Sequence, residues 1–257
     1  MNLGINSFLL EDKLVMVTGA SSGIGRQCAI KCGQLGASVI LLGRDQTRLA
    51  ESLEMMNDTE KHMICSVDLL DYDKIGVAVK EVVAKKGRIE GLINCAGIST
   101  TLPLNSVSPP LMNQFFQANV IGGINLTKQV VKQSHFSNEG GSIIFISSIM
   151  GVVGENGKTL YSMTKGALIA AVKSMAVELA PRKIRVNSIS PGVVDSPMSK
   201  GAIYSKDEQS LSRIRSLHPL GIGQPEDIAN LCGFMLSGAA RWITGTNIVI
   251  DGGYLAK

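Results

Sequence analysis

Short apolar runs alternate along the chain with longer segments in which apolar residues recur at helical spacing. Seven runs predict strands, at residues 14–17, 39–42, 63–67, 91–94, 142–146, 185–189 and 247–250, and helical segments between them include 25–35, 73–86, 109–133, 160–180 and 225–236. A continuously apolar strand is typical of a parallel sheet covered by helices on both faces. The pattern therefore predicts an α/β fold with a doubly wound, seven-stranded parallel sheet, which binds ligands beyond the carboxyl ends of its strands.

The chain length suits a single domain over 1–257. It has 257 residues, of which 45% are hydrophobic, and it contains no repeat or linker. The one long irregular stretch, 196–223, follows the sixth predicted strand, and loops of that length often cover a ligand site. Its apolar residues, Ile203, Tyr204 and Ile214 among them, suit the roof of a pocket or, equally well, an ordinary amphipathic surface helix.

Composition excludes several classes of function. The net charge is +4 with both signs interspersed, so we expect no nucleic-acid partner. No stretch reaches the ~18 apolar residues of a membrane span, and no secretory signal is visible. The five cysteines are odd in number and lack a C-x-x-C pair, which indicates reduced thiols and a cytoplasmic location. The histidines are scattered and Cys28 and Cys32 have no further ligands near them, so we expect core thiols and no metal site.

A glycine-rich turn follows the first predicted strand and opens a helix. Glycines in that position let the backbone approach a pyrophosphate, whose charge is met by the free N–H groups of the helix N-terminus. The spacing G-x-x-x-G-x-G differs from the generic G-x-G-x-x-G, but the context of strand, turn and helix is the correct one. The predicted cofactor-binding residues of this turn are Thr18, Gly19, Ser21, Ser22, Gly23, Ile24 and Gly25.

The end of the second predicted strand favours NADP over NAD. An acidic residue there would bind the ribose 2′-hydroxyl of NAD, whereas an arginine can bind the extra phosphate of NADP. Gly43 occupies the acidic position and Arg44 follows it. The alternative is that Arg44 is simply solvated while Asp45 caps the next helix.

Tyr161 and Lys165 are four residues apart at the start of an apolar helical segment, so their side chains project from one face. A tyrosine with a pKa near ~10 is a poor proton donor or acceptor at neutral pH. A fixed ammonium nearby stabilises the phenolate and brings the pKa toward the working range. The pair suits acid-base chemistry, although this spacing alone often arises by chance.

Several motifs occur in one order over almost the whole chain, and together they resemble the short-chain dehydrogenase/reductase family. Within that family, the chain is most similar to the 3-oxoacyl-carrier-protein reductase type. The motifs are T-G-x-x-x-G-x-G at 18–25, N-C-A-G at 94–97, Asn119, the serine pair at 147–148, Y-x-x-x-K at 161–165 and P-G at 191–192.

This resemblance implies a catalytic tetrad of Asn119, Ser148, Tyr161 and Lys165. Ser148 is preferred to Ser147 because it lies thirteen residues before the tyrosine, the usual spacing in this branch. Ser148 would hydrogen-bond the substrate carbonyl while Tyr161 donates a proton to its oxygen. Lys165 would bind the nicotinamide ribose and lower the pKa of Tyr161, and Asn119 would hold a water. Separately, each has an ordinary alternative, such as a helix cap, a strand end or a solvated lysine.

The resemblance also implies further cofactor contacts. Asp68 and Leu69 would lie beside the adenine, a second set under the adenosine ribose, and a third along the nicotinamide. The residues implied under the adenosine ribose are Asn94, Ala96 and Gly97. Those implied along the nicotinamide are Pro191, Gly192, Val194 and Ser196, together with Tyr161 and Lys165. Cys95 replaces the common second asparagine of the motif, and we expect little effect because backbone approach does not need that side chain.

The implied activity is NADPH-dependent reduction of a carbonyl to an alcohol, with a 3-oxoacyl thioester as the leading substrate. Carrier-docking reductases often have two basic positions that correspond here to Glu139 and Arg182, so half of the basic patch is missing. An alternative is an NAD- or NADP-dependent enzyme that acts on a sugar, a polyketide or a small ketone or alcohol. A further alternative is a nucleotide-binding scaffold without catalytic activity. The helical segment 160–180 is apolar nearly all round, and with the resemblance it implies a homotetramer.

Overall fold

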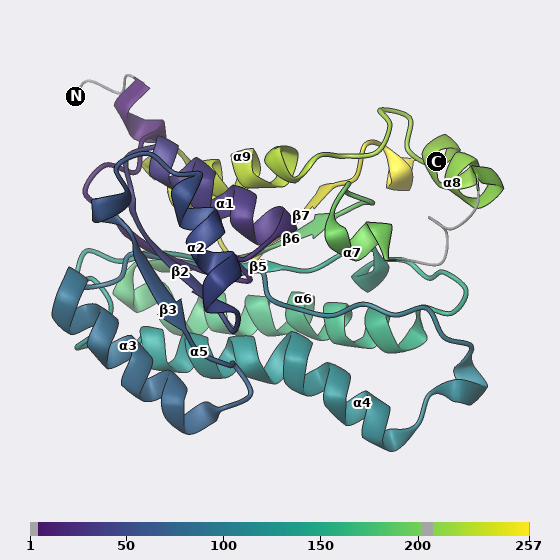
Figure 1. Cartoon of the computed structure of the whole chain (residues 1–257), viewed down its shortest axis with the longest axis horizontal. Coiled ribbons are helices and arrows are strands. Elements are labelled where there is room, and N and C mark those ends of the chain that lie inside the picture. Colours follow the sequence, from purple (N-terminus) through teal and green to yellow (C-terminus); the bar gives the residue numbers. More distant parts are fainter. Residues whose placement is uncertain (1–4, 202–207, 257) are drawn as a thin grey trace.

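Seven parallel strands form one sheet in the computed structural model, which describes residues 5–201 and 208–256 (Figure 1). The strands are β1 (Leu14–Thr18), β2 (Ser38–Gly43), β3 (Met63–Ser66), β4 (Gly91–Asn94), β5 (Gly141–Ile146), β6 (Ile184–Pro191) and β7 (Asn247–Ile250). Their order in the sheet is β3-β2-β1-β4-β5-β6-β7, and every neighbouring pair is parallel. The predicted fold class and all seven strands are confirmed.

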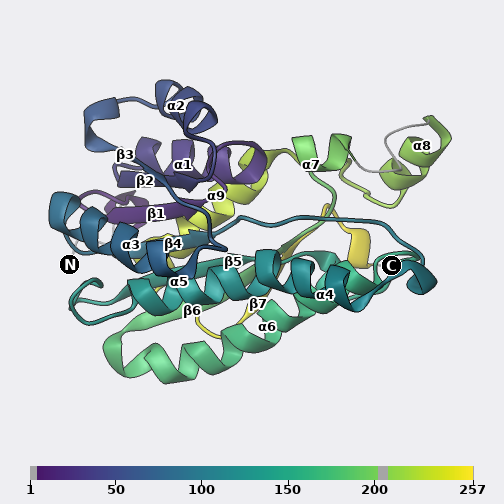
Figure 2. The same ribbon diagram turned by 60° about the horizontal axis from the view of Figure 1, so that its bottom comes forward.

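Helices cover both faces of the sheet (Figures 1 and 2). One layer holds α1 (Gly23–Gln34), α2 (Gln46–Glu54) and α9 (Pro225–Leu236), and the other holds α3 (Tyr72–Lys86), α4 (Pro109–Phe116), α5 (Gly122–Val130) and α6 (Thr159–Leu179). Two short helices, α7 (Pro197–Lys200) and α8 (Glu208–Ser216), follow β6. Among the helices that the structure describes, none has both the length and the apolar character needed to cross a bilayer.

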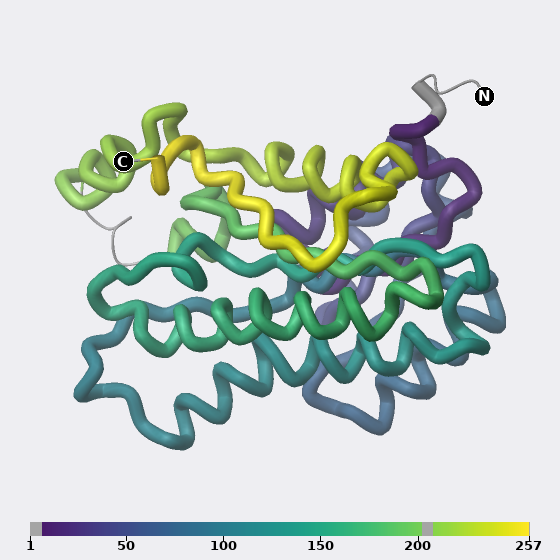
Figure 3. Tube along the Cα trace, turned by 180° about the vertical axis from the view of Figure 1, so that it is seen from behind, coloured from purple at the N-terminus to yellow at the C-terminus, as the bar shows by residue number. Residues whose placement is uncertain are grey.

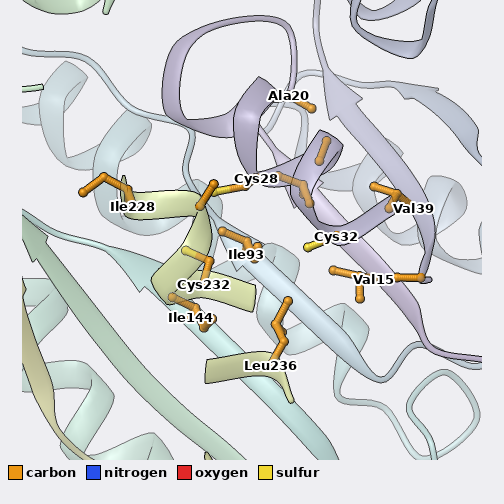
Figure 4. Close-up of a cluster of buried hydrophobic side chains, with 14 of the residues drawn as sticks. Val15, Ala20, Cys28, Cys32, Val39, Ile93, Ile144, Ile228, Cys232 and Leu236 are labelled. Atoms are coloured by element: carbon orange, nitrogen blue, oxygen red, sulfur yellow. The ribbon is translucent and has the colours of Figure 1, made fainter. Parts of the chain in front are cut away.

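The side chains of each strand alternate between two hydrophobic cores. Val15 and Val17 of β1 pack with α1 and α9 on one face, whereas Met16 packs with α3, α5 and α6 on the other. Period-two alternation with apolar residues on both sides is what a doubly wound sheet requires. Figure 4 shows the first core, where Cys28 and Cys32 of α1 meet Cys232 of α9; all three are fully buried, as expected of core thiols.

The helical predictions were wrong at two places. The segment 109–133 is not one α-helix, because a π-helical turn at Gln117–Ile121 separates α4 from α5, and the helix ends at Val130. The other is α2, which is polar and short; a helix after Asp45 was considered only as an alternative, and its extent was not predicted. Its N-cap is Asp45, whose side chain accepts a hydrogen bond from the Arg48 N–H at 3.1 Å. The cap considered for Asp45 is therefore present.

The segment after β6 lies beyond the carboxyl ends of the strands. From behind, Figure 3 shows the C-terminal segment with β7 running along the sheet edge and its last turn lying close to α8. His218, just after α8, packs against Tyr254 with the two rings tilted and their centroids 5.0 Å apart. Ile214 of α8 is buried as a pocket roof requires, whereas Ile203 and Tyr204 lie outside the described residues.

Candidate active site

A cavity of about 490 Å³ lies beyond the carboxyl ends of the strands, where the sheet order reverses between β1 and β4. This is where a doubly wound sheet binds its ligand. Most of the predicted site residues line it: Gly19, Ser21, Ser22, Gly23, Ile24, Gly25, Arg44, Asp68, Leu69, Ala96, Gly97, Ser148, Tyr161, Lys165, Pro191, Gly192, Val194 and Ser196. The other three, Thr18, Asn94 and Asn119, are buried beside the cavity without lining it.

The glycine-rich turn leaves room for a dinucleotide. Gly19 has a φ of +67°, which disfavours other residues. A Cβ on Gly25 would lie 2.3 Å from the Gly19 carbonyl oxygen, so the tight turn requires glycine there. The side chain of Ser22, the N-cap of α1, makes no capping hydrogen bond. Because Gly23 and Ile24 also line the cavity, the positive end of α1 is open to the phosphates of a nucleotide.

Thr18 and Asn94 hold the loop after β4 in place. The Thr18 Oγ1 accepts hydrogen bonds from the backbone N–H groups of Cys95 at 2.9 Å and Ala96 at 3.0 Å. The Asn94 Nδ2 donates to the Thr127 Oγ1 at 3.1 Å. Neither of the Thr18 bonds uses the Cys95 side chain, which agrees with a small effect of cysteine in this motif. Direct contact of Thr18 or Asn94 with a cofactor stays a prediction.

The end of the cavity beside β2 is positively charged. Arg44 lies 3.9 Å from Asp68, and its side chain is 71% exposed, which leaves the guanidinium accessible. Arg48, on the first turn of α2, lines the same end but was not predicted, because the helix that presents it was missed. No acidic side chain occupies the last position of β2, which is Gly43. These residues suit a phosphate better than a ribose hydroxyl.

Tyr161 and Lys165 lie together on the first turns of α6. The Lys165 Nζ is 5.6 Å from the centroid of the Tyr161 ring and donates a hydrogen bond to the Ile146 carbonyl oxygen at 2.8 Å. Burial lowers the pKa of Lys165 to about 8, so the solvated alternative was wrong. A lysine with this pKa is still mainly an ammonium at neutral pH and stabilises a negative charge on the neighbouring phenol.

Asn119 lies in the π-helical turn and contacts the wall of the cavity. Its Oδ1 accepts a hydrogen bond from the Ile98 N–H at 2.7 Å, and its Nδ2 donates to the Ile98 carbonyl at 3.0 Å and the Thr164 Oγ1 at 3.0 Å. It therefore joins the loop after β4 to α6 between Tyr161 and Lys165. π-turns of this kind are frequent at functional sites. Its predicted water stays a prediction.

The two adjacent serines have different surroundings. The Ser147 Oγ donates to the Lys165 carbonyl oxygen at 2.8 Å and so anchors α6 to the end of β5. Both serines line the cavity, and the Ser148 Oγ accepts a hydrogen bond from the Met150 N–H at 3.2 Å. The Ser147 hydroxyl thus donates within the protein, whereas the Ser148 Oγ is an acceptor in the bond described, and the substrate-binding role of Ser148 stays a prediction.

Glu155, Lys158 and Tyr254 are among the further polar residues that line the cavity without having been predicted. Lys158 could have been found by extending the Tyr161 face one helical turn toward the N-terminus, since residues three apart are neighbours on a helix. Tyr254 comes from the far end of the chain, and the sequence carries no signal that brings it here.

The two positions that correspond to a carrier-docking patch do not form one. Glu139 is exposed just before β5. The Arg182 guanidinium donates a hydrogen bond to the Val131 carbonyl oxygen of its own chain, which occupies part of its hydrogen-bonding capacity. A polyanionic carrier would meet a carboxylate at the first position.

Comparison with known proteins shows what the chain is related to. The family model for enoyl-(acyl carrier protein) reductase matches residues 19–255. The chain is 36% identical over 250 residues to the 3-oxoacyl-[acyl-carrier-protein] reductase of Thermotoga maritima, with 95% of this chain and 98% of that protein covered. It is 33% identical over 253 residues to the L-rhamnose 1-dehydrogenase (NAD(P)(+)) of Azotobacter vinelandii, with 95% and 97% covered.

A solved structure of a dehydrogenase/reductase from Sinorhizobium meliloti 1021 superimposes with a TM-score of 0.88 at 28% identity, over 97% of each chain. Fold, site and relatives agree. The chain belongs to the short-chain dehydrogenase/reductase family and is an oxidoreductase that acts on CH–OH or C=O groups.

Proposed function

We propose that this enzyme reduces a carbonyl group to an alcohol with NADPH, and that Tyr161 donates the proton. The observation that carries the proposal is the buried Lys165 ammonium, 5.6 Å from the Tyr161 ring centroid, in the same cavity as the glycine-rich turn. A phenol beside a fixed positive charge is a competent acid near neutral pH.

The residues of the cavity then have distinct tasks. Bound NADPH supplies a hydride to the carbonyl carbon. Ser148 hydrogen-bonds the carbonyl oxygen, and Tyr161 transfers its phenolic proton to that oxygen, which completes the alcohol and leaves a phenolate. Lys165 stabilises the phenolate and binds the nicotinamide ribose. Asn119 keeps the loop at Ile98 in place and holds the water through which Tyr161 regains a proton from solvent.

The preference for NADP(H) rests on Arg44 and Arg48, with glycine at the last position of β2. Kinetics with NADPH and NADH test it. We expect NADPH to give the higher kcat/KM, and Arg44→Ala to lower kcat/KM for NADPH by about 10-fold or more while NADH changes little. Equal use of the two cofactors by the wild-type enzyme would favour an NAD-linked alcohol or sugar dehydrogenase instead.

A 3-oxoacyl thioester is the leading substrate, since a relative at 36% identity is a 3-oxoacyl-[acyl-carrier-protein] reductase. The similarity to L-rhamnose 1-dehydrogenase supports a sugar or small alcohol as the second candidate. NADPH oxidation across acetoacetyl thioesters, sugars and small ketones separates the two. Turnover of thioesters alone supports the thioester as substrate, and the absence of thioester turnover excludes it.

A scaffold without activity would bind NADPH but turn over no ketone of this panel, and the complete set of Asn119, Ser148, Tyr161 and Lys165 speaks against it.

We also propose a cytoplasmic homotetramer that acts on a small-molecule or carrier-bound carbonyl compound. The five thiols are free, which suits a reducing compartment. Met163 and Val177 on α6 are 43% and 78% exposed, which suits a subunit contact.

A further inference from the structure

Lys158 is a second lysine beside Tyr161 that the proposed reaction does not use. It lines the cavity, and its Nζ is 5.8 Å from the centroid of the Tyr161 ring, close to the 5.6 Å of Lys165. Lys158 precedes the tyrosine by three residues and Lys165 follows it by four, so the two ammonium groups flank the phenol along the helix.

The cost of burying Lys158 is only partly offset by its partners. The residue is 8% exposed. Its Nζ donates a hydrogen bond to the Thr100 carbonyl oxygen at 3.2 Å, and within the described parts of the chain no carboxylate forms an ion pair with it. Burial lowers its pKa, while the charge of Glu155 acts in the opposite direction. An ammonium has three donors, and buried lysines are rare unless they are paired.

The net charge around Tyr161 favours an anion. The charged side chains that line this end of the cavity are Lys158, Lys165 and Glu155. Two positive groups against one negative group leave an excess of positive charge beside the reacting position. A cavity with such a charge attracts negatively charged ligands, and low-dielectric walls strengthen that attraction.

We infer that Lys158 binds a carboxylate of the substrate, so that the preferred substrate is a free 3-oxo acid in place of the thioester that similarity to the reductase of Thermotoga maritima suggests. The inference rests on the proposed reduction of a 3-oxoacyl group and specifies the group at C1. With the C3 carbonyl at Ser148 and Tyr161, a carboxylate two carbons away stays beside the same phenol that Lys158 flanks. In the reverse direction the substrate is the 3-hydroxy acid.

The surface of the chain agrees with a free acid. A carrier-bound thioester would need a basic docking patch, whereas Glu139 is exposed and Arg182 is bonded to the Val131 carbonyl. The carboxylate of a free acid replaces that docking with one charge-assisted hydrogen bond inside the cavity.

A purely structural role for Lys158 predicts a different outcome. If the lysine only tethers the loop at Thr100, its loss affects every substrate to a similar degree. A carboxylate-binding role predicts a loss confined to acids, so the ratio of two substrates separates the two roles.

The first test compares acetoacetate with its N-acetylcysteamine thioester, which is uncharged and has the same reacting carbonyl. We expect the wild-type enzyme to have the higher kcat/KM for acetoacetate. Lys158→Gln should lower the ratio of kcat/KM for acid over thioester by about 10- to 100-fold, the value of a hydrogen bond between charged groups. Lys158→Arg should restore part of the ratio, and Lys80→Gln, on the exposed face of α3, should leave it unchanged. An unchanged ratio in Lys158→Gln overturns the inference.

A second test does not depend on turnover. Binding of acetoacetate to Tyr161→Phe with NADPH present is followed by ligand-observed NMR, and the double variant with Lys158→Gln should bind about 10- to 100-fold more weakly. Absence of binding in Tyr161→Phe, or equal binding in both proteins, overturns the carboxylate site. Other results would contradict the proposed reduction itself: turnover retained in Tyr161→Phe, or no reduction of any carbonyl compound by the wild-type enzyme.

Discussion

At the scale of single residues, the depth at which Lys165 is buried sets both its pKa and the strength with which its charge acts on Tyr161. Its ammonium is 4% exposed and donates to the Ile146 carbonyl, and burial has lowered its pKa to about 8. A deeper position would remove the charge at neutral pH, and a more exposed one would weaken its effect on the Tyr161 phenolate. The observed balance keeps the lysine charged just where the tyrosine needs it.

This balance predicts a pH dependence of cofactor binding. Because the pKa of Lys165 is lowered, the ammonium is present below about pH 8 and is lost as the pH rises through that value. NADPH affinity, measured by fluorescence titration of the free enzyme, should therefore fall above pH 8, by up to about tenfold per pH unit. Lys165→Met should bind more weakly and lose this dependence. Constant affinity of the wild-type enzyme up to pH 10 would contradict the role of Lys165.

At the scale of elements, the turn between β1 and α1 joins the sheet to the cofactor. The sequence allowed this turn to be predicted because glycine spacing is a local signal. The π-helical turn at Gln117–Ile121 and the extent of α2 could not be predicted, since one extra residue only shifts the phase of an apolar pattern that is already irregular, and α2 has few apolar residues. Arg48 was missed for the same reason.

The tight turn gives a prediction at this scale. Gly25→Ala places a Cβ 2.3 Å from the Gly19 carbonyl oxygen, a backbone atom that cannot move without opening the turn. We expect a loss of about 1–3 kcal/mol of stability in thermal or denaturant unfolding, and much weaker NADPH binding.

Gly76→Ala is the matched control. It lies inside α3, where a Cβ would meet the Gln129 side chain only at 3.6 Å. It should raise stability by up to about 1 kcal/mol and leave NADPH binding intact. Normal NADPH affinity in Gly25→Ala would show that the turn does not hold the phosphates.

At the scale of the whole molecule, the sequence predicted the doubly wound sheet because fully apolar strands and intervening helices leave few other folds. Helical spacing predicted that Tyr161 and Lys165 share one face of a helix, whereas Asn119 and Ser148 could be proposed only from the family resemblance, because they come from other elements. Lys158 was missed, since a single lysine near a helix start is usually solvated and only the packing of the loop at Thr100 buries it. Tyr254 was missed because the path of the chain after β7, which places it at the cavity, leaves no local pattern in the sequence.

The exposed apolar face of α6 gives the prediction for assembly. Met163 and Val177 should lie in a subunit contact, so sedimentation should show a tetramer for the wild-type protein. Val177→Glu should shift the protein to a smaller species, because a carboxylate buried in an apolar contact is costly. Lys80→Gln, on a polar exposed position of α3, should leave the tetramer unchanged. A monomeric wild-type protein would contradict the proposed assembly.

The most direct test of the proton donor is single-turnover reduction of a confirmed substrate by Tyr161→Phe with NADPH bound. The substitution removes one hydroxyl and keeps the ring between Lys158 and Lys165. We predict unchanged folding, NADPH affinity within about threefold of the wild type, and a rate of NADPH oxidation lowered by at least about 100-fold, the lower end of what a positioned general acid contributes. A rate close to that of the wild-type enzyme would show that the proton comes from another group.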